Sequence, residues 1–310
     1  MAERRGAIVI LGVFVADTAY RARRQPRMGE TILGQSFALG PGGKGSNQAV
    51  AAARAGGAVH FVSRLGQDTF AEMAQATWAD AGVTPEITED ADSYTGAAYI
   101  FVEDGTGENA IIIAPGAAGR ISPGDVEARS DLIAGAGVFM TQLEQPIPAA
   151  RRALEIARAG GAVTVLNPAP AAELPEGMLA LCDYVTPNES EAEGLTGIAV
   201  DGRDSAARAA RALIDQGAGA AIVTLGADGA LYDDGSGARH IPALSAGEVV
   251  ETTGAGDAFA GGFAAALAEG RAPEDAVRFA AATAAISVTR PGTAPSMPAR
   301  GEIEALLARG

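Results

Sequence analysis

Short apolar runs alternate with amphipathic segments along most of the chain. These runs, which are mostly apolar, span residues 7–12, 59–63, 138–143, 163–166, 184–185 and 221–225. Short segments of mainly apolar residues are typical of strands buried on both faces of a parallel sheet. The segments between and after them, at residues 48–55, 70–81, 149–159, 205–216, 273–288 and 302–308, have helical character. This alternation predicts an α/β fold with a mostly parallel central sheet that is flanked by helices on both faces.

Residues 96–114 interrupt this alternation. Two apolar runs, at residues 97–102 and 110–114, flank a connection that holds two glycines, which predicts a β-hairpin. Because the hairpin lies between α/β segments, we expect it to project from the main sheet as a small lid. Residues 18–39, by contrast, are polar and follow neither period, so the pattern alone predicts an irregular segment there.

Two residues indicate helix boundaries. Gly82 directly follows the helical segment 70–81, and glycine is the usual residue just beyond a helix C-terminus. Ser205 stands at the start of the segment 205–216, where a serine hydroxyl can cap the first free N–H groups. We therefore expect the first helix to end at Gly82 and the second to have Ser205 as its N-cap.

Composition and charge exclude several classes of protein. The chain has 310 residues, which is ample for a large core, and a net charge of −15, which argues against nucleic acid or an anionic membrane as partner. An anionic substrate would then need a locally positive site made by backbone amides or a metal. The single cysteine, Cys182, excludes an internal disulfide and is predicted to be buried, and two histidines do not suffice for a histidine metal cluster. With neither a signal peptide nor a membrane-length apolar run, we expect a soluble, cytoplasmic protein.

The strongest chemical signal is the sequence Glu-Thr-Thr-Gly-Ala-Gly-Asp at residues 251–257, followed by an apolar helical run. A tight glycine-rich turn that enters a helix presents free N–H groups and the positive end of the helix dipole to an anion. Asp257 lies at that positive end, where we expect it to stay ionised and to accept a proton from an attacking hydroxyl. An anion site beside a base suits phosphoryl transfer. From this stretch alone, an acidic residue in the first turn of an ordinary core helix is an equally good interpretation.

A second glycine-rich stretch, residues 40–47, formally matches the dinucleotide pattern G-x-G-x-x-G. Its context is wrong, since the nearest preceding apolar strand lies about thirty residues earlier. A nicotinamide-dependent dehydrogenase would rest on this match only. The pattern predicts a flexible loop that carries Lys44 and Asn47 at a helix start, where ammonium and amide donors suit a polyhydroxy ligand. A glycine-rich connection with a solvated lysine is the alternative.

Further polar side chains follow predicted strands. Glu144 comes directly after the run 138–143, and Asn188, Glu189 and Glu191 follow the run 184–185. Ligands bind at the carboxyl ends of the strands in open parallel sheets, so Glu144 could accept sugar hydroxyls and the second group could hold Mg²⁺ through water near phosphates. Helix capping competes with both interpretations.

Taken in order, these motifs resemble the ribokinase-like carbohydrate and purine kinase family from about residue 7 to residue 308. The resemblance rests on Asp17, Gly29-Glu30-Thr31, residues 42–49, Gln142-Leu143-Glu144, residues 166–170, residues 188–191, Thr224-Leu225-Gly226 and residues 254–257. It implies one kinase domain over residues 1–310, with a projecting lid formed by segments at about 13–38 and 96–115 that often pairs two subunits, hence a homodimer. It also implies transfer of phosphate from ATP to the primary hydroxyl of a sugar, with Mg²⁺ and a monovalent cation, K⁺, as cofactors.

The resemblance assigns roles to individual residues. Asp257 would be the catalytic base, and the amides of Gly254, Ala255 and Gly256 would form the anion hole. The sugar would be held by Asp17, Gly42, Gly43, Lys44, Asn47, Glu144 and Asp257. The nucleotide would be held by Asn188, Thr224, Gly226, Asp228, Gly229 and Gly256, with Asn188 and Glu191 organising Mg²⁺ through water. The K⁺ ligands would be Glu251, Thr253, Ser287, Arg290, Gly292 and Ser296.

Three positions depart from the family pattern and leave the substrate open. Val15 stands where the family usually has Asn, which removes a polar group near the sugar; Glu251 replaces the usual Asp at the cation site. Ala281 stands where a polar residue often lies near adenine in the family, which implies relaxed purine selectivity. D-ribose, giving D-ribose 5-phosphate, is the expected substrate, and another pentose, deoxyribose, a ketohexose or a nucleoside is the alternative. A catalytically silent sugar-binding sensor is a further alternative, against which the intact 254–257 motif argues.

Overall fold

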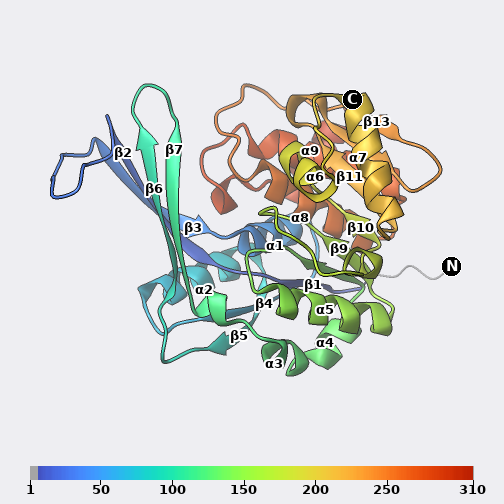
Figure 1. Cartoon of the computed structure of the whole chain (residues 1–310), viewed down its shortest axis with the longest axis horizontal. Helices are drawn as coiled ribbons and strands as arrows, with labels where there is room; N and C mark the ends of the chain where they lie inside the picture. Colours follow the sequence, from blue (N-terminus) through green and yellow to red (C-terminus); the bar gives the residue numbers. More distant parts are fainter. Residues whose placement is uncertain (1–5, 310) are drawn as a thin grey trace.

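A nine-stranded sheet forms the centre of the computed structural model, which describes residues 6–309 (Figure 1). The strand order is β13-β12-β11-β10-β9-β8-β1-β4-β5, and all neighbours from β11 to β5 are parallel. The bounds are β1 Ile8–Leu11, β4 Val59–Leu65, β5 Thr84–Glu89, β8 Val138–Thr141, β9 Val163–Leu166, β10 Tyr184–Val185, β11 Ala220–Thr224, β12 Ala230–Asp233 and β13 Arg239–Ile241. The pattern did not predict β5, β12 and β13, which lie at or near the two edges of the sheet, where strands need not be apolar throughout.

Helices cover both faces of this sheet, as the sequence predicts. One face carries α1 (Lys44–Arg54), α2 (Thr69–Ala81), α8 (Ala255–Ala268), α9 (Pro273–Ser287) and α10 (Arg300–Leu307). The other carries α3 (Pro123–Glu127), α4 (Ser130–Ala134), α5 (Ile147–Gly160), α6 (Glu189–Thr196) and α7 (Arg203–Asp215). Successive residues of β1 alternate between the two cores, since Ile8 and Ile10 pack in the first and Val9 and Leu11 in the second. In the part of the chain that the structure describes, none of these helices has the length and hydrophobicity that a membrane span requires.

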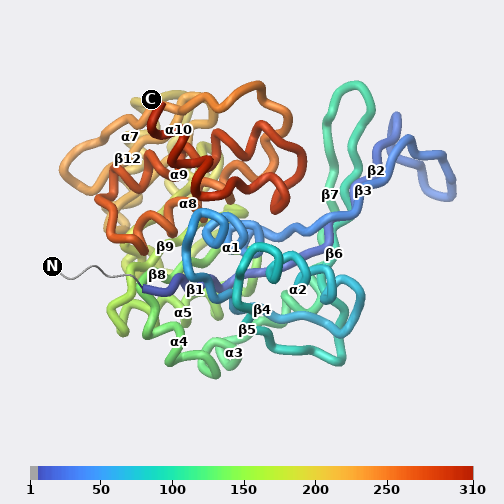
Figure 2. The backbone as a smooth tube through the Cα atoms, turned by 180° about the vertical axis from the view of Figure 1, so that it is seen from behind, coloured from blue at the N-terminus to red at the C-terminus, as the bar shows by residue number. Residues whose placement is uncertain are grey.

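A separate four-stranded sheet forms the lid, which extends away from the body in both views (Figure 1 and Figure 2). Its strands are β2 (Val15–Ala22), β3 (Ser36–Gly42), β6 (Thr95–Glu103) and β7 (Asn109–Gly116), in the order β3-β2-β6-β7. The hairpin prediction is therefore confirmed. The prediction of an irregular segment at 18–39 holds for residues 23–35 and is wrong at both ends, where β2 and β3 form. These strands pair with each other, and β2 also pairs with β6, and pairing with a distant strand leaves no local signal.

Two boundary predictions have opposite outcomes. Gly82 ends α2 in the left-handed conformation, with φ of 78°, as expected. Ser205, by contrast, is not the N-cap of α7, because the helix already begins at Arg203 and Gly202 is its N-cap. The Ser205 hydroxyl instead accepts the backbone N–H groups of Asp201 and Gly202 from inside the first turn.

Candidate active site

Polar residues from distant parts of the chain surround a cavity of about 150 Å³ at the carboxyl ends of the parallel strands. Its lining residues are Lys44, Asn167, Ala169, Thr186, Asn188, Glu191, Thr224, Gly254, Gly256, Asp257 and Phe259. The two chemical motifs that the sequence predicts, at 40–47 and 251–257, therefore contribute to the same cavity. This is the edge at which open parallel sheets bind ligands.

Asp257 lies in the first turn of α8 and is 7% exposed. Its Oδ2 accepts a hydrogen bond from Asn47 Nδ2 and its Oδ1 accepts one from Gln48 Nε2, each at 3.0 Å. Burial raises the pKa of Asp257, while the charge of Lys44 and the two amide bonds act in the opposite direction. Removal from water therefore acts against the helix end and the charge of Lys44, on which the prediction that Asp257 stays ionised rests; that prediction stays a prediction.

Close packing of α1 against α8 brings the two amides to the carboxylate. A Cβ on Gly261 of α8 would lie 2.5 Å from the carbonyl oxygen of Gln48 and 2.5 Å from the Cβ of Ala51. Only glycine lets the helices approach this closely. The Gly261 contact lies one helical turn from Asp257 and so holds the Asp257 carboxylate close to its hydrogen-bond donors.

The turn before Asp257 has the geometry of an anion site, with one difference from expectation. Gly254 adopts φ of 81° at the N-cap of α8, and a Cβ on Gly256 would meet no atom within 4 Å, so its backbone borders open space. Both glycines line the cavity. The N–H of Ala255, however, donates to the carbonyl of Thr252 at 3.1 Å, so the turn itself uses that donor.

Asp17 projects from β2 over Gly42 of the neighbouring strand. A Cβ on Gly42 would lie 2.3–2.4 Å from the carboxylate atoms of Asp17, so this glycine makes room for the acid. Gly43 has φ of 89°, and a Cβ there would lie 2.5 Å from the carbonyl oxygen of Val13. The expected flexible loop at 40–47 is wrong, because β3 runs to Gly42 and α1 starts at Lys44. Burial, with the nearby charge of Asp257, raises the pKa of Asp17 to about 6.

Glu144 anchors the start of α1. Its Oε2 accepts the backbone N–H of Lys44 at 2.7 Å, and burial raises its pKa to about 7 against the opposing effect of Lys44. Glu144 therefore caps a helix, as the alternative interpretation held. The helix is α1, whose first residue lies 100 positions before Glu144 in the sequence. The Oδ1 of nearby Asn47 is buried without a hydrogen-bond partner, which leaves it free to accept a ligand hydroxyl.

Asn188 and Glu191 form a capping box at the start of α6. The helix-capping interpretation of these two residues is therefore confirmed. Asn188 Oδ1 accepts the N–H of Glu191 at 2.8 Å, and Glu191 Oε2 accepts the N–H of Asn188 at 2.9 Å. Both side chains nevertheless line the cavity, and burial raises the pKa of Glu191. Within residues 6–309, no group of three or more acidic, histidine or cysteine side chains could hold a metal alone.

The residues expected at the nucleotide follow β11 at the same edge. Thr224 ends this strand and lines the cavity, and its N–H donates to the carbonyl of Pro187. A short 3₁₀ turn, Gly226–Asp228, comes next and does not line the cavity. Gly229, with φ of 93°, has no room for a Cβ, which would lie 2.2 Å from the carbonyl oxygen of Ile241.

The expected cation ligands lie in the turn that holds Glu251 and Thr253, at the C-terminal end of α9, and in the turns after it, and a hydrogen bond joins the first turn to the residues after α9. Glu251 Oε2 accepts the N–H of Gly292 at 2.8 Å. The hydroxyls of Ser287 and Ser296 are buried and donate to the carbonyls of Ala284 and Thr293. The Arg290 side chain pairs with Glu302. Because a guanidinium is positively charged and has no acceptor atom, only the backbone carbonyl of Arg290 could bind a cation.

Four residues of the site were given no role by the sequence analysis: Gln48, Gln142, Asn167 and Thr186. The last three follow β8, β9 and β10 directly. A polar residue shortly after a buried strand is also the signal that identified Glu144 and Asn188, which lie three residues beyond the ends of β8 and β10. Gln48 gave no comparable signal, since its importance depends on the packing of α1 against α8.

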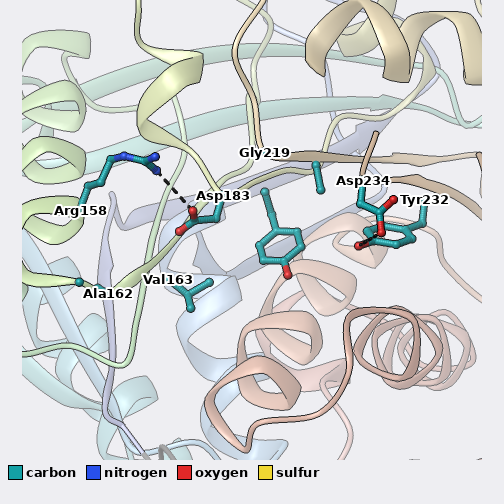
Figure 3. A pocket seen from close by; sticks show the side chains of 10 residues that line it. Arg158, Ala162, Val163, Asp183, Gly219, Tyr232 and Asp234 are labelled. Atoms are coloured by element: carbon teal, nitrogen blue, oxygen red, sulfur yellow. Dashed lines mark hydrogen bonds and ion pairs between the residues drawn. The ribbon is translucent and has the colours of Figure 1, made fainter. Parts of the chain in front are cut away.

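A larger cavity, of about 580 Å³, opens at the opposite edge of the sheet, near the starts of β9, β10 and β11 (Figure 3). Charged groups in its lining are already paired. Arg158 contacts Asp183 at 3.3 Å, and Asp234 accepts the hydroxyl of Tyr232 at 3.3 Å. No predicted site residue lines it, so the smaller cavity is the candidate active site.

Several known proteins that resemble this chain are sugar kinases by name. The model of the pfkB family carbohydrate kinases matches residues 7–300. The ribokinase of Haemophilus influenzae is 39% identical over 299 residues, which cover 96% of this chain and 97% of that protein. The deoxyribokinase of Salmonella typhimurium is 36% identical over 293 residues, covering 94% and 95%. The structure of Arabidopsis thaliana ribokinase complexed with ribose and ATP superposes with a TM-score of 0.92 at 30% identity, covering 97% of this chain and 98% of that one. The chain therefore belongs to the pfkB family of carbohydrate kinases.

Proposed function

We propose that this kinase transfers the γ-phosphoryl group of ATP to the primary hydroxyl of D-ribose and releases D-ribose 5-phosphate and ADP. The observation that carries the proposal is the buried carboxylate of Asp257, which shares one cavity with Lys44 and the Gly254–Gly256 turn. The relatives named above act on ribose or deoxyribose by their names, which supports a pentose. Measuring ADP release across a panel of sugars and nucleosides tests the proposal directly.

The chemistry follows from the placement of charge. Asp257 accepts the proton of the sugar hydroxyl as its oxygen attacks the γ-phosphorus, and the bond from that phosphorus to the β,γ-bridging oxygen breaks. The backbone of Gly254 and Gly256, at the positive end of α8, faces the charge on the transferring group. Lys44 lines the same cavity, and its ammonium can balance further negative charge.

Mg²⁺ fits the donor set if phosphate and water complete its coordination. Glu191 and Asn188 line the cavity and offer oxygen atoms, the ligands that Mg²⁺ prefers. They would hold the ion through water, because their side chains also form the capping box. The ion, when bound, neutralises phosphate charge in the transition state.

The choice between ribose and 2-deoxyribose tests the sugar site. Asp17, Asn47 and Glu144 offer acceptors for hydroxyls, and a buried polar group left unpaired costs about 1–3 kcal/mol. We therefore expect kcat/KM for ribose to exceed that for 2-deoxyribose by about tenfold or more. Val15 lies on the same side of β2 as Asp17 and offers only methyl groups, which reduces the difference. Equal kcat/KM values would favour a deoxyribokinase, and preference for a nucleoside would contradict a free pentose.

Activation by K⁺ tests the turns that the hydrogen bond from Gly292 to Glu251 joins. An oxygen-coordinated ion between them would hold the Gly254–Gly256 turn in its anion-binding shape before charge develops. We expect kcat to rise several-fold in K⁺ over Na⁺ or Li⁺ at constant ionic strength and saturating Mg²⁺-ATP. Glu251→Asp should keep this activation and Glu251→Ala should weaken it. Equal rates in K⁺, Na⁺ and a bulky organic cation would show that the turns hold no functional ion.

The outer face of the lid supports a homodimer. Residues that pair directly across strands share a face, so Asp17, Ala98 and Ile113 lie on one side of the lid. Tyr20, Phe37, Leu39, Tyr99 and Ile112 lie on the other side, where Phe37 is 56% and Ile112 is 68% exposed. Large exposed apolar patches on such a face mark contact surfaces.

Light scattering tests the homodimer. We expect the wild type to have twice the mass of the chain and Phe37→Asp to be a monomer; a monomeric wild type would contradict the proposal.

A further inference from the structure

Gln48 is fully buried in α1, and every polar atom of its side chain is engaged. Its Nε2 donates to Asp257 Oδ1 and to Asn167 Oδ1, each at 3.0 Å. Its Oε1 accepts from Gln142 Nε2 at 2.6 Å. An amide nitrogen has two N–H donors, so both are used and one is directed at the carboxylate of the base.

The neighbours of Gln48 permit only one orientation of its amide. Asn167 Nδ2 donates to the carbonyl of Thr186 at 2.8 Å, which leaves Asn167 Oδ1 as the acceptor that faces Gln48. Gln142 directs its own N–H at the oxygen of Gln48. Turning the Gln48 amide over would place donor against donor and acceptor against acceptor at three contacts. A chain of amides that begins at the strand ends therefore determines which atom meets Asp257.

The two donors to Asp257 differ in what else they contact. Asn47 has a buried oxygen without a partner, so its position can respond to a bound sugar. Gln48 does not line the cavity. The charged groups that face Asp257 are Lys44 of α1, Asp17 of β2, Glu144 after β8 and Glu191 of α6. Gln48, in contrast to these charged groups, is neutral, and its contact with Asp257 can hold the carboxylate in place both with and without ligand.

We propose that Gln48 is a positioning residue, whose amide holds the Asp257 carboxylate in the orientation in which it accepts the proton of the sugar hydroxyl. This inference rests on the proposed role of Asp257 as the base. A carboxylate has about four lone-pair directions, and the amides of Asn47 and Gln48 occupy two of them. The remaining directions are then fixed toward the cavity. Small errors in the placement of a reacting group are costly in rate, so loss of this contact acts on kcat.

A double-mutant cycle with Asp257 tests the proposal. Gln48→Met keeps the length of the side chain and removes the amide, and we expect kcat to fall by about 10- to 100-fold. The KM for ribose should change by less than about threefold. In an Asp257→Asn background the same substitution should change kcat by less than about threefold, because Gln48 acts through the base. Ser46→Ala is the matched control: Ser46 is also fully buried in α1, but it accepts its bond from Trp78 Nε1, and its loss should leave kcat within about twofold.

Gln48→Glu provides a second measurement should Gln48→Met fail to fold. When protonated, the new side chain can still donate to Asp257, whereas when ionised it repels it. We expect the ratio of wild-type to variant kcat to grow as pH rises from about 5.5 to 8.5; a flat ratio would overturn the proposal.

Three other outcomes would also overturn the proposal. They are a kcat within about threefold of wild type for a folded Gln48→Met, full additivity in the cycle, and an equal loss of kcat in Ser46→Ala. A normal Gln48→Met beside an inactive Asp257→Asn would refute the positioning role alone, while a near-normal Asp257→Asn would refute the base assignment and this inference with it.

Discussion

Asp257→Asn is expected to lower kcat by about 10²- to 10⁴-fold, the usual cost of losing a general base, with little change in the KM for the sugar. The substitution keeps the shape of the side chain but removes its negative charge, one acceptor oxygen and the ability to take up the proton. An asparagine can still accept the bonds from Asn47 or Gln48 through its one oxygen, so the fold around α8 should persist. The rate of ADP release at saturating ATP and ribose measures the effect.

Asp275→Asn is the matched control for this experiment. Asp275 is the third residue of α9, as Asp257 is of α8, but it is exposed. An acid in the first turn stabilises a helix by about 0.3–1 kcal/mol through the dipole alone, and that contribution should not affect kcat. If Asp257→Asn retained more than about a tenth of wild-type kcat, Asp257 would be no more than such a first-turn acid.

The parts of the fold that follow from local pattern could be predicted from the sequence. The buried strands are mostly apolar because both faces of the sheet are covered, and Gly82 marks the end of α2 because glycine adopts its backbone conformation without strain. The lid strand β3 could not be predicted in this way. Its residues are mostly exposed, and it is held by pairing with β2, whose own other partner, β6, is about eighty residues away in sequence.

The candidate site shows the same division. The sequence identified the residues that carry a recognisable motif, and the structure brings Lys44, Asn188, Glu191, Thr224, Gly254, Gly256 and Asp257 to one cavity. It could not identify Gln48, whose contact with Asp257 joins residues 209 positions apart. Nor could it give the direction of the pKa shift of Asp257, because burial is a property of the packed helices and not of the helix end.

Asp17→Asn should lower kcat/KM for ribose by about 10²-fold while it stabilises the protein at neutral pH. The loss follows from the proposed role of Asp17, since a hydrogen bond from a sugar hydroxyl to a buried carboxylate contributes about 1.5–3 kcal/mol. Most of the change should appear in KM, because the carboxylate holds the sugar and takes no part in proton transfer. Initial rates over a range of ribose concentrations separate the two constants, and an unchanged KM would remove Asp17 from the sugar site.

The gain in stability has a definite sign and pH window. The pKa of Asp17 is raised from 3.8 to about 6 by burial and by the charge of Asp257, so between these values the folded state binds more protons than the unfolded state. The wild-type carboxylate therefore reduces stability progressively as pH rises from about 4 to 6, and its full cost is present above about pH 7. One pKa unit corresponds to about 1.4 kcal/mol, which sets an upper limit of about 3 kcal/mol for this cost. Asparagine carries no charge at any of these pH values and avoids it.

Denaturant unfolding of both proteins from pH 4 to pH 8 measures this gain. The variant should match the wild type near pH 4 and exceed it by about 1–3 kcal/mol above pH 7, within the limit set by the pKa of Asp17. A difference that is constant with pH would mean that the effect comes from packing and not from the buried charge. A lower stability at neutral pH would mean that Asp17 is held by favourable contacts in the free protein. The expected result, better folding with poorer catalysis, is the signature of a residue retained for its function.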